Sequence, residues 1–130
     1  MPGETELAII SYLQGQAIFS EGDVGTNAYI VEKGSVEIWR KGDDGSKIIF
    51  ATLGPGSVFG ELALINPAPR AANATSVDVS TLIVVPKFVL DVQMKKSDAF
   101  IRKMMLALID NVRRLTDRID QLEGTANKRD

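Results

Sequence analysis

Residues 16–86 consist of short apolar runs separated by turns that contain glycine, and this pattern constrains the fold more than any other feature of the chain. The clearest runs lie at residues 17–19, 29–31, 48–51 and 82–85. Val36 and Ile38 alternate with polar residues, as expected for a strand with one buried face. Several short strands joined by glycine turns are typical of a sandwich, roll or barrel. The segment therefore predicts an antiparallel β-structure.

The apolar pattern becomes helical after Pro86. Residues 87–95 predict one short helix. Ser97 is suited to cap a second helix, with Asp98 at its positive end, and Gly124 is suited to stop it. A helix between these points has about 27 residues and a length of roughly 40 Å.

The N-terminal segment and the tail complete the predicted architecture. Residues 7–14 carry apolar side chains at helical spacing and precede Gly15, which predicts a short amphipathic helix. The fold class is thus α+β: an antiparallel, jelly-roll-like β-roll with a short N-terminal helix and two C-terminal helices. The size suits a single domain, residues 1–123. The polar tail, residues 124–130, is expected to be disordered.

Composition narrows the chemistry. The 130 residues include no cysteine and no histidine, so zinc and most transition metals lack their preferred ligands and the commonest general base is missing. We therefore expect no metal, no cofactor and no catalysis. The net charge of −2 gives no reason to expect nucleic-acid binding. No apolar run approaches the roughly 20 residues that span a bilayer, and the acidic start is unlike a signal peptide, so we expect a cytoplasmic protein.

Residues 59–73 carry the most distinctive chemistry. They begin with Gly60 and Glu61, continue through an apolar run long enough for about one to one and a half helical turns, and close on Arg70. The start of such a turn presents unpaired N–H groups, and an arginine adds a planar charged fork, so together they suit a phosphate. Glu61 would then accept hydrogen bonds from nearby hydroxyl groups. A phosphate next to a pair of hydroxyl groups is what a nucleotide presents. The residues alone equally allow Glu61 and Arg70 to pair across a surface turn.

The sequence Phe-Gly-Glu-Leu-Ala-Leu, followed by Pro-Arg-Ala-Ala, resembles the phosphate-binding cassette of the cyclic nucleotide-binding domain family. The likeness extends over nearly all of residues 16–86. It includes, in order, the motifs Glu-Gly-Asp at 21–23, Ala-Tyr-Ile at 28–30 and Lys-Gly-Ser-Val at 33–36. The resemblance implies a β-roll whose cassette binds a cyclic phosphate and its ribose.

The resemblance implies a role for each cassette residue. Gly60 and Ala63 would turn their backbone toward the ribose and phosphate, with Leu62 packed beside them. Glu61 would accept a hydrogen bond from the ribose 2′-hydroxyl. Arg70 would pair with the exocyclic phosphate oxygens.

The residues after the arginine are expected to complete the ligand site. The N–H of Ala71 would add a donor, and Ala72 belongs to the same binding segment. Relatives that favour cyclic GMP often carry threonine at the position of Ala71, so alanine implies a preference for cyclic AMP, with cyclic GMP as the other possible ligand. Ile38 and Phe50 lie where relatives pack against the purine, although both could equally be ordinary core residues. The departure from the family pattern is Asn73, where threonine or serine is common.

The long C-terminal helix supplies further candidates. Arg114, Leu115 and Arg118 are candidates to cap the base. Apolar residues also recur at alternating spacings of four and three, which is a heptad seam. The seam consists of Ile101, Met105, Leu108, Val112, Leu115, Ile119 and Leu122. It allows either a homodimer or a monomer whose helix folds over its own ligand site.

These observations predict a non-catalytic sensor that prefers cyclic AMP and transmits binding through its C-terminal helices to an unknown downstream protein. The alternative is a ligand-independent adaptor that keeps the β-roll and dimerises through its C-terminal helix. A phosphodiesterase is disfavoured because the chain lacks histidine.

Overall fold

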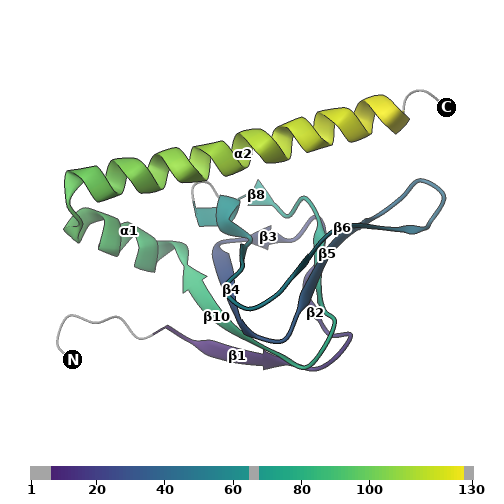
Figure 1. The fold of residues 1–130 in the computed structure, drawn as a ribbon, viewed down its shortest axis with the longest axis horizontal. Helices are drawn as coiled ribbons and strands as arrows, with labels where there is room; N and C mark the ends of the chain where they lie inside the picture. The colour runs from purple at the N-terminus through teal and green to yellow at the C-terminus, as the bar shows by residue number, and fades with distance from the viewer. Residues whose placement is uncertain (1–6, 65–67, 128–130) are drawn as a thin grey trace. The chain divides into compact units, whose positions relative to one another are not determined.

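The computed structural model describes residues 7–64 and 68–127 (Figure 1). The chain forms two compact units, Met1–Asp91 and Val92–Asp130. The first unit holds the strands and the start of the first helix. The second holds the remainder of that helix and the long helix that follows.

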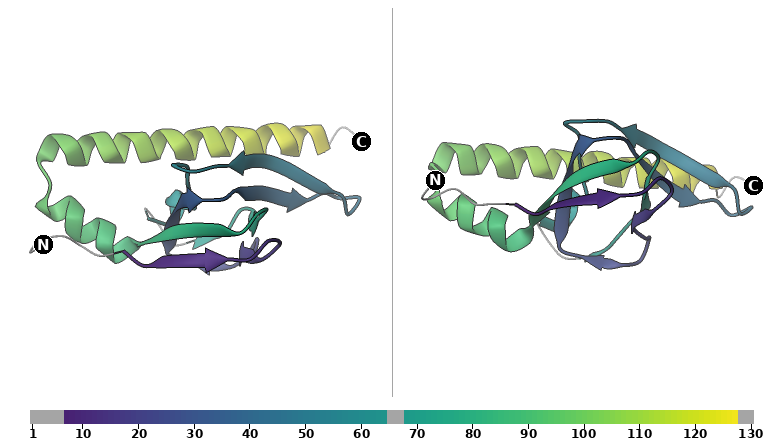
Figure 2. Two further views of the ribbon diagram at one scale, coloured as in Figure 1. Left: turned by 60° about the horizontal axis from the view of Figure 1, so that its bottom comes forward. Right: turned by 90° about the horizontal axis from the view of Figure 1, so that it is seen from below.

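The first unit is built from antiparallel strands. One sheet has the order β1-β10-β4-β7, a second has the order β2-β9-β5-β6, and β3 pairs with β8. The strands are β1 (Ile9–Tyr12), β2 (Ala17–Phe19), β3 (Val24–Gly25), β4 (Asn27–Lys33), β5 (Val36–Lys41), β6 (Lys47–Leu53), β7 (Val58–Phe59), β8 (Ala68–Pro69), β9 (Asn73–Ser76) and β10 (Ser80–Pro86). Figure 2 shows the layer that contains β1 and β10 opposite the layer that contains β5 and β6. The predicted antiparallel β-roll is therefore confirmed.

The core lies between the two four-stranded sheets. Both contribute apolar side chains, so alternate residues of each strand are removed from water. Its buried members are Tyr29, Val31, Val36, Phe59, Ala74, Leu82 and Val84. Phe19 and Ile38 pack against this cluster from β2 and β5.

The predicted N-terminal helix at residues 7–14 is wrong. Residues 9–12 form β1, which pairs antiparallel with β10 so that Ile9 lies opposite Ile83 and Tyr12 opposite Ser80. Ile9 is 59% exposed, so the helical spacing of the apolar residues here does not correspond to a buried face. β-branched and aromatic residues suit strands, and pairing covers the backbone of β10, which would otherwise be an open sheet edge.

The two C-terminal helices are confirmed, with different limits. They are α1 (Lys87–Lys96) and α2 (Ala99–Asn127). The Asp98 carboxylate accepts a hydrogen bond from the N–H of Phe100 at 2.8 Å, so Asp98 caps α2 in place of the predicted Ser97. The Ser97 hydroxyl instead donates to the carbonyl oxygen of Met94 at 2.8 Å.

The long helix continues past the predicted stop at Gly124. It has 29 residues, a length of roughly 43 Å. One glycine inside a helix costs only about 1 kcal/mol, which a long helix can absorb. Residues 124–127 of the expected disordered tail are therefore helical, and residues 128–130 lie outside the described part of the chain.

Candidate functional site

The cassette begins as a tight turn that only glycine can make easily. Phe59 is buried at the end of β7, and Gly60 has φ +72°, in the left-handed region. A 3₁₀ helix, η1 (Glu61–Leu64), follows directly, so the predicted helical turn is confirmed. Glu61 and Leu62 are half-buried, and Ala63 is buried. The end of the apolar run and the first proline, residues 65–67, lie outside the described residues.

Arg70 is buried, with 8% of its surface exposed. Its Nη1 donates to the carbonyl oxygen of Gly60 at 3.2 Å, and its Nη2 donates to the carbonyl oxygen of Asn27 at 2.7 Å. Its Nε is buried and has no hydrogen-bond partner among the described residues. The alternative of a surface ion pair with Glu61 is therefore wrong, because the guanidinium is inside the roll and bonded to backbone oxygens.

Aromatic rings line the same guanidinium. The Cζ of Arg70 lies 4.2 Å from the ring centroid of Phe19 and 6.0 Å from that of Tyr29. Burial lowers the pKa of Arg70 from its ordinary value, while Tyr29, Asp23 and Glu61 act in the opposite direction. Arginine nevertheless stays protonated in proteins. Among the described residues, no carboxylate forms an ion pair with this buried cation, and such an arrangement favours an anion.

The backbone of Arg70 is fixed by the segment before β4. The N–H of Arg70 donates to the carbonyl oxygen of Asp23 at 2.7 Å, and the N–H of Gly22 donates to the carbonyl oxygen of Arg70 at 2.8 Å. Val24 and Pro69 are paired across β3 and β8. These bonds connect residues almost fifty positions apart, so the backbone of the arginine is tied to the segment at residues 22–24.

Ala71 and Ala72 follow Arg70, the first exposed and the second half-buried. The carbonyl oxygen of Ala71 accepts a hydrogen bond from Nε of Arg40 at 3.0 Å. Arg40 was not among the predicted site residues. It lies two positions after Ile38, and residues two apart in a strand share a face, which is the signal that could have found it.

Phe50 reaches this face because of a β-bulge. Ile38 pairs with Ala51 while Trp39 pairs with Ile49, so Phe50 is the additional residue in β6. The Cζ of Arg40 lies 5.3 Å from its ring centroid. The structure therefore connects Phe50 to Ala71 through Arg40, while Ile38 packs against the core.

The remaining candidates belong to the second unit. Arg114 donates to Asn111 at 3.1 Å and pairs with Asp110 at 2.9 Å along α2. Leu115 and Arg118 are exposed on the same helix. Their role as caps of the base stays a prediction.

The heptad seam is open along its described part. Ile101, Met105, Leu108 and Leu115 are exposed, and Val112 is half-buried. The side chains of Ile119 and Leu122 lie outside the described residues. The dimer that the seam suggests stays a prediction.

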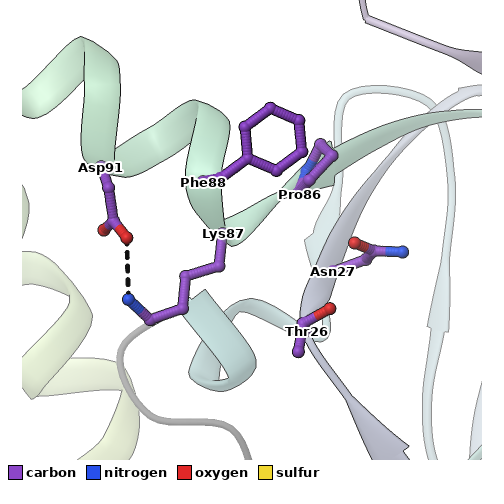
Figure 3. Close-up of a pocket in the computed structure, with 6 residues that line it drawn as sticks. All are labelled: Thr26, Asn27, Pro86, Lys87, Phe88 and Asp91. Atoms are coloured by element: carbon purple, nitrogen blue, oxygen red, sulfur yellow. Dashed lines mark hydrogen bonds and ion pairs between the residues drawn. The ribbon is translucent and has the colours of Figure 1, made fainter.

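A pocket of about 470 Å³ lies where the roll meets α1 (Figure 3). It is lined by Thr26, Asn27, Pro86, Lys87, Phe88 and Asp91. The N–H of Lys87 donates to the carbonyl oxygen of Thr26 at 3.0 Å, and the Lys87 ammonium pairs with Asp91 at 2.9 Å. Because Asn27 also accepts the bond from Arg70, the pocket adjoins the arginine through one residue.

The described residues offer neither a metal site nor a membrane span. No group of three or more His, Cys, Asp or Glu side chains is placed to hold a metal ion. Within the same residues, no helix is long and apolar enough to cross a membrane.

The sequence and the fold are both similar to those of known proteins. Residues 9–97 match the model of the cyclic nucleotide-binding domain family. A CRP-like cAMP-activated global transcriptional regulator of Mycobacterium tuberculosis is 35% identical over 72 residues, which are 55% of this chain and 32% of the regulator. A cAMP-dependent protein kinase regulatory subunit of Yarrowia lipolytica is 44% identical over 62 residues, which are 48% of this chain and 16% of the subunit. This chain thus spans about a third or less of these relatives' length.

A solved structure is similar over most of the chain. The half-site-occupied form of the EAL enzyme Bd1971 superposes with a TM-score of 0.75 at 33% identity. The match covers 85% of this chain and 99% of that chain.

Proposed function

This chain belongs to the cyclic nucleotide-binding domain family, and we propose that it is a non-catalytic sensor that binds cyclic AMP in preference to cyclic GMP. The observation that carries the proposal is the guanidinium of Arg70, which is charged, buried and unpaired at Nε. Two of its five N–H groups bond to backbone oxygens, and one further N–H on each of Nη1 and Nη2 remains for phosphate oxygens. A phosphate would supply the missing negative charge.

The proposed ligand contacts are concentrated in the cassette. Gly60, Glu61, Leu62 and Ala63 would surround the ribose and phosphate from the turn before η1 and from η1 itself. Arg70 would hold the phosphate. The alanines at positions 71 and 72 would contribute the backbone on the other side of the arginine. The tight turn at Gly60, where one Arg70 bond also ends, supports this grouping.

The preference for cyclic AMP rests on the residue after the arginine. Ala71 has no hydroxyl group to bond the amino group of guanine. Phe50 is proposed to pack against the purine, because the β-bulge brings it beside Arg40 and hence beside Ala71. Ile38 is proposed to act with it from the neighbouring strand.

We propose that binding is transmitted to the C-terminal helices through the start of β4. Arg70 bonds to the Asn27 carbonyl, and the neighbouring Thr26 carbonyl accepts the first N–H of α1, from Lys87. A guanidinium that moves toward a phosphate would alter its bond to Asn27. Ligand can shift the helix position only to the extent that it binds the two positions with different affinity.

We also propose a homodimer through the heptad seam, with the downstream protein unidentified. The exposed seam of Ile101, Met105, Leu108 and Leu115 supports this assembly. The same observation favours the second candidate function, an adaptor that dimerises without any ligand. The absence of histidine and cysteine from the sequence supports a role without catalysis.

The test is calorimetric titration of protein freed of co-purified nucleotide. We expect heat on addition of cyclic AMP, weaker binding of cyclic GMP, and loss of binding in Arg70→Ala. Removing one partner of a buried charge pair costs roughly 2–5 kcal/mol, at least about 30-fold in affinity.

Arg113→Ala is the matched control, since this exposed arginine pairs with Asp110 one turn earlier on α2. Folded protein that binds neither nucleotide would leave the adaptor as the function. Equal binding by wild type and Arg70→Ala would show that the arginine does not hold the phosphate.

A further inference from the structure

Gly25 approaches the guanidinium of Arg70 more closely than a side chain would permit. It pairs with Ala68 across β3 and β8, two residues before Arg70. A methyl group on Gly25 would lie 2.2 Å from Nε, 2.4 Å from Cζ and 2.4 Å from Nη2 of Arg70. All three distances are far shorter than a van der Waals contact. With any other residue at position 25, the guanidinium would have to move.

The backbone does not explain the glycine. In the described part of the chain, six other glycines have positive φ, including Gly60, whereas the φ of Gly25 lies outside the left-handed region. An alanine could therefore adopt the backbone of Gly25 without strain. The nearest atoms to the added methyl group all belong to Arg70. The absence of a side chain at position 25 thus leaves room for the guanidinium of Arg70.

The other contacts of the guanidinium define a specific pose. A methyl group on Gly60 would lie 2.9 Å from Nη1, and the Phe19 ring centroid lies 4.2 Å from Cζ. The carbonyl oxygens of Gly60 and Asn27 hold Nη1 and Nη2. Nε, which lies nearest to the position of the added methyl group, is the atom without a partner.

We infer that Gly25 is a positioning residue of the anion site: its missing side chain leaves the space that the Arg70 guanidinium occupies. The inference rests on the proposed function only for the identity of the anion, a cyclic nucleotide phosphate. Gly25→Ala should displace the guanidinium by collision and thereby weaken phosphate binding. The fold should survive, because the displaced group is the end of a flexible side chain.

Binding and stability test the inference in the full chain. Gly25→Ala is expected to raise the dissociation constant for cyclic AMP at least tenfold. Gly54→Ala is the matched control, because Gly54 also lies outside the left-handed region and has no atom within 4 Å of an added methyl group. It is expected to bind like wild type.

A double-mutant cycle on the melting temperature separates positioning from a general structural role. Gly25→Ala should lower the melting temperature of wild type by displacing a buried, hydrogen-bonded group. In the Arg70→Ala background no collision remains. There the same substitution should leave the melting temperature unchanged or raise it, since alanine reduces the entropy of the unfolded chain.

Each outcome decides a different point. Cyclic AMP binding to Gly25→Ala at wild-type strength would overturn the inference. A decrease in melting temperature that persists in the Arg70→Ala background would also overturn it, because Gly25 would then be required by the pairing of β3 with β8 and not by the arginine. Folded wild type that binds no cyclic nucleotide would refute the proposed function, while the melting-temperature cycle would still decide whether Gly25 positions the guanidinium.

Discussion

Nη2 of Arg70 lies 2.7 Å from the carbonyl oxygen of Asn27, which is forty-three residues earlier in the chain. Asn27 begins β4 and pairs with Pro86, the last residue of β10 before α1. One side chain of the cassette is therefore bonded to the point where the roll passes into its first helix. The proposed transmission of ligand binding to that helix would pass through this contact.

Arg70→Lys separates charge from shape. Lysine keeps the positive charge but has no planar fork, so it cannot bond to Gly60 and Asn27 while also holding two phosphate oxygens. Losing a hydrogen bond to a charged group costs roughly 1.5–3 kcal/mol, so we expect at least tenfold weaker binding of cyclic AMP than wild type, measured by calorimetry. Arg70→Ala should bind cyclic AMP more weakly than Arg70→Lys. A lysine variant that binds like wild type would contradict the proposed contact with two phosphate oxygens.

Ala71→Thr tests the origin of the nucleotide preference. A hydroxyl group at this position could bond the guanine amino group, so the affinity for cyclic GMP should rise relative to that for cyclic AMP. Competition of both nucleotides for one fluorescent analogue measures the ratio. Ala71→Val has nearly the same shape without the hydroxyl group and should not change the preference. If valine acts like threonine, size rather than hydrogen bonding sets the selectivity.

Leu108→Asp tests the proposed dimer. Leu108 belongs to the heptad seam and is 53% exposed, while Leu106 lies outside the seam and is 52% exposed. A carboxylate inside a dimer seam would have to lose its water, which opposes association. We expect Leu108→Asp to shift the protein to monomer in analytical ultracentrifugation, and Leu106→Asp to behave like wild type. Monomeric wild type would reject the dimer and leave the adaptor without its mode of assembly.

Gly34→Ala should destabilise the roll. Gly34 has φ +91°, and a methyl group there would lie 2.3 Å from Oγ of Ser80 and 2.6 Å from the Val79 carbonyl oxygen. The Ser80 hydroxyl is itself bonded to both the N–H and the carbonyl oxygen of Ser35 at 3.1 Å. The left-handed backbone alone costs an alanine about 1–3 kcal/mol, and the collision adds to this.

The comparison is with Gly45→Ala, measured by urea unfolding. Gly45 has φ +85° and only Lys41 Cε, at 3.9 Å, near an added methyl group. It therefore has the backbone strain without the collision. Equal losses of unfolding free energy in the two variants would show that the turn at Ser80 relaxes around the methyl group.

The raised pKa of Tyr12 predicts that the protein loses stability at alkaline pH. Burial raises the pKa of Tyr12 above its ordinary value of 10.0, with Tyr29 adding to the shift. The folded protein therefore holds this proton more tightly than the unfolded chain. Its contribution is complete below the unfolded pKa, about 10, and is lost as the pH rises through the raised value.

Urea unfolding on both sides of that pH measures the effect, with Tyr12→Phe as the variant. Phenylalanine keeps the ring of β1 but has no proton to lose. Its unfolding free energy should fall less between the two conditions. The same fall in both proteins would assign the alkaline loss to other groups.

The sequence predicts the roll and Arg70, but it does not predict what surrounds Arg70. The guanidinium is contacted by residues that lie more than forty positions earlier in the chain, namely Phe19, Gly25 and Asn27. Sequence spacing does not show contacts over such a separation. In the sequence Gly25 looks like an ordinary turn glycine. Only the structure gives its φ and shows that an added methyl group would collide with Nε of Arg70.

Local patterns also mislead where the partner decides the structure. The run that contains Ile9 and Tyr12 fits a helix by spacing, but it becomes a strand because β10 offers an edge to pair with. The sequence around Phe50 does not indicate a β-bulge. The additional residue is visible only in the pairing register of β5 with β6.

The pairing of β1 with β10 also bears on how such a unit can be combined with others. Because the strands are antiparallel, the start of β1 and the end of β10 lie at the same end of one sheet, with neighbouring strands about 5 Å apart. Ile9 lies opposite Ile83, three residues before Pro86, so the two ends of the roll lie roughly 11 Å apart. Such a roll could be inserted into a surface loop of an unrelated protein with little distortion of either structure. A conformational change at Pro86 would then act directly at the junction between the two.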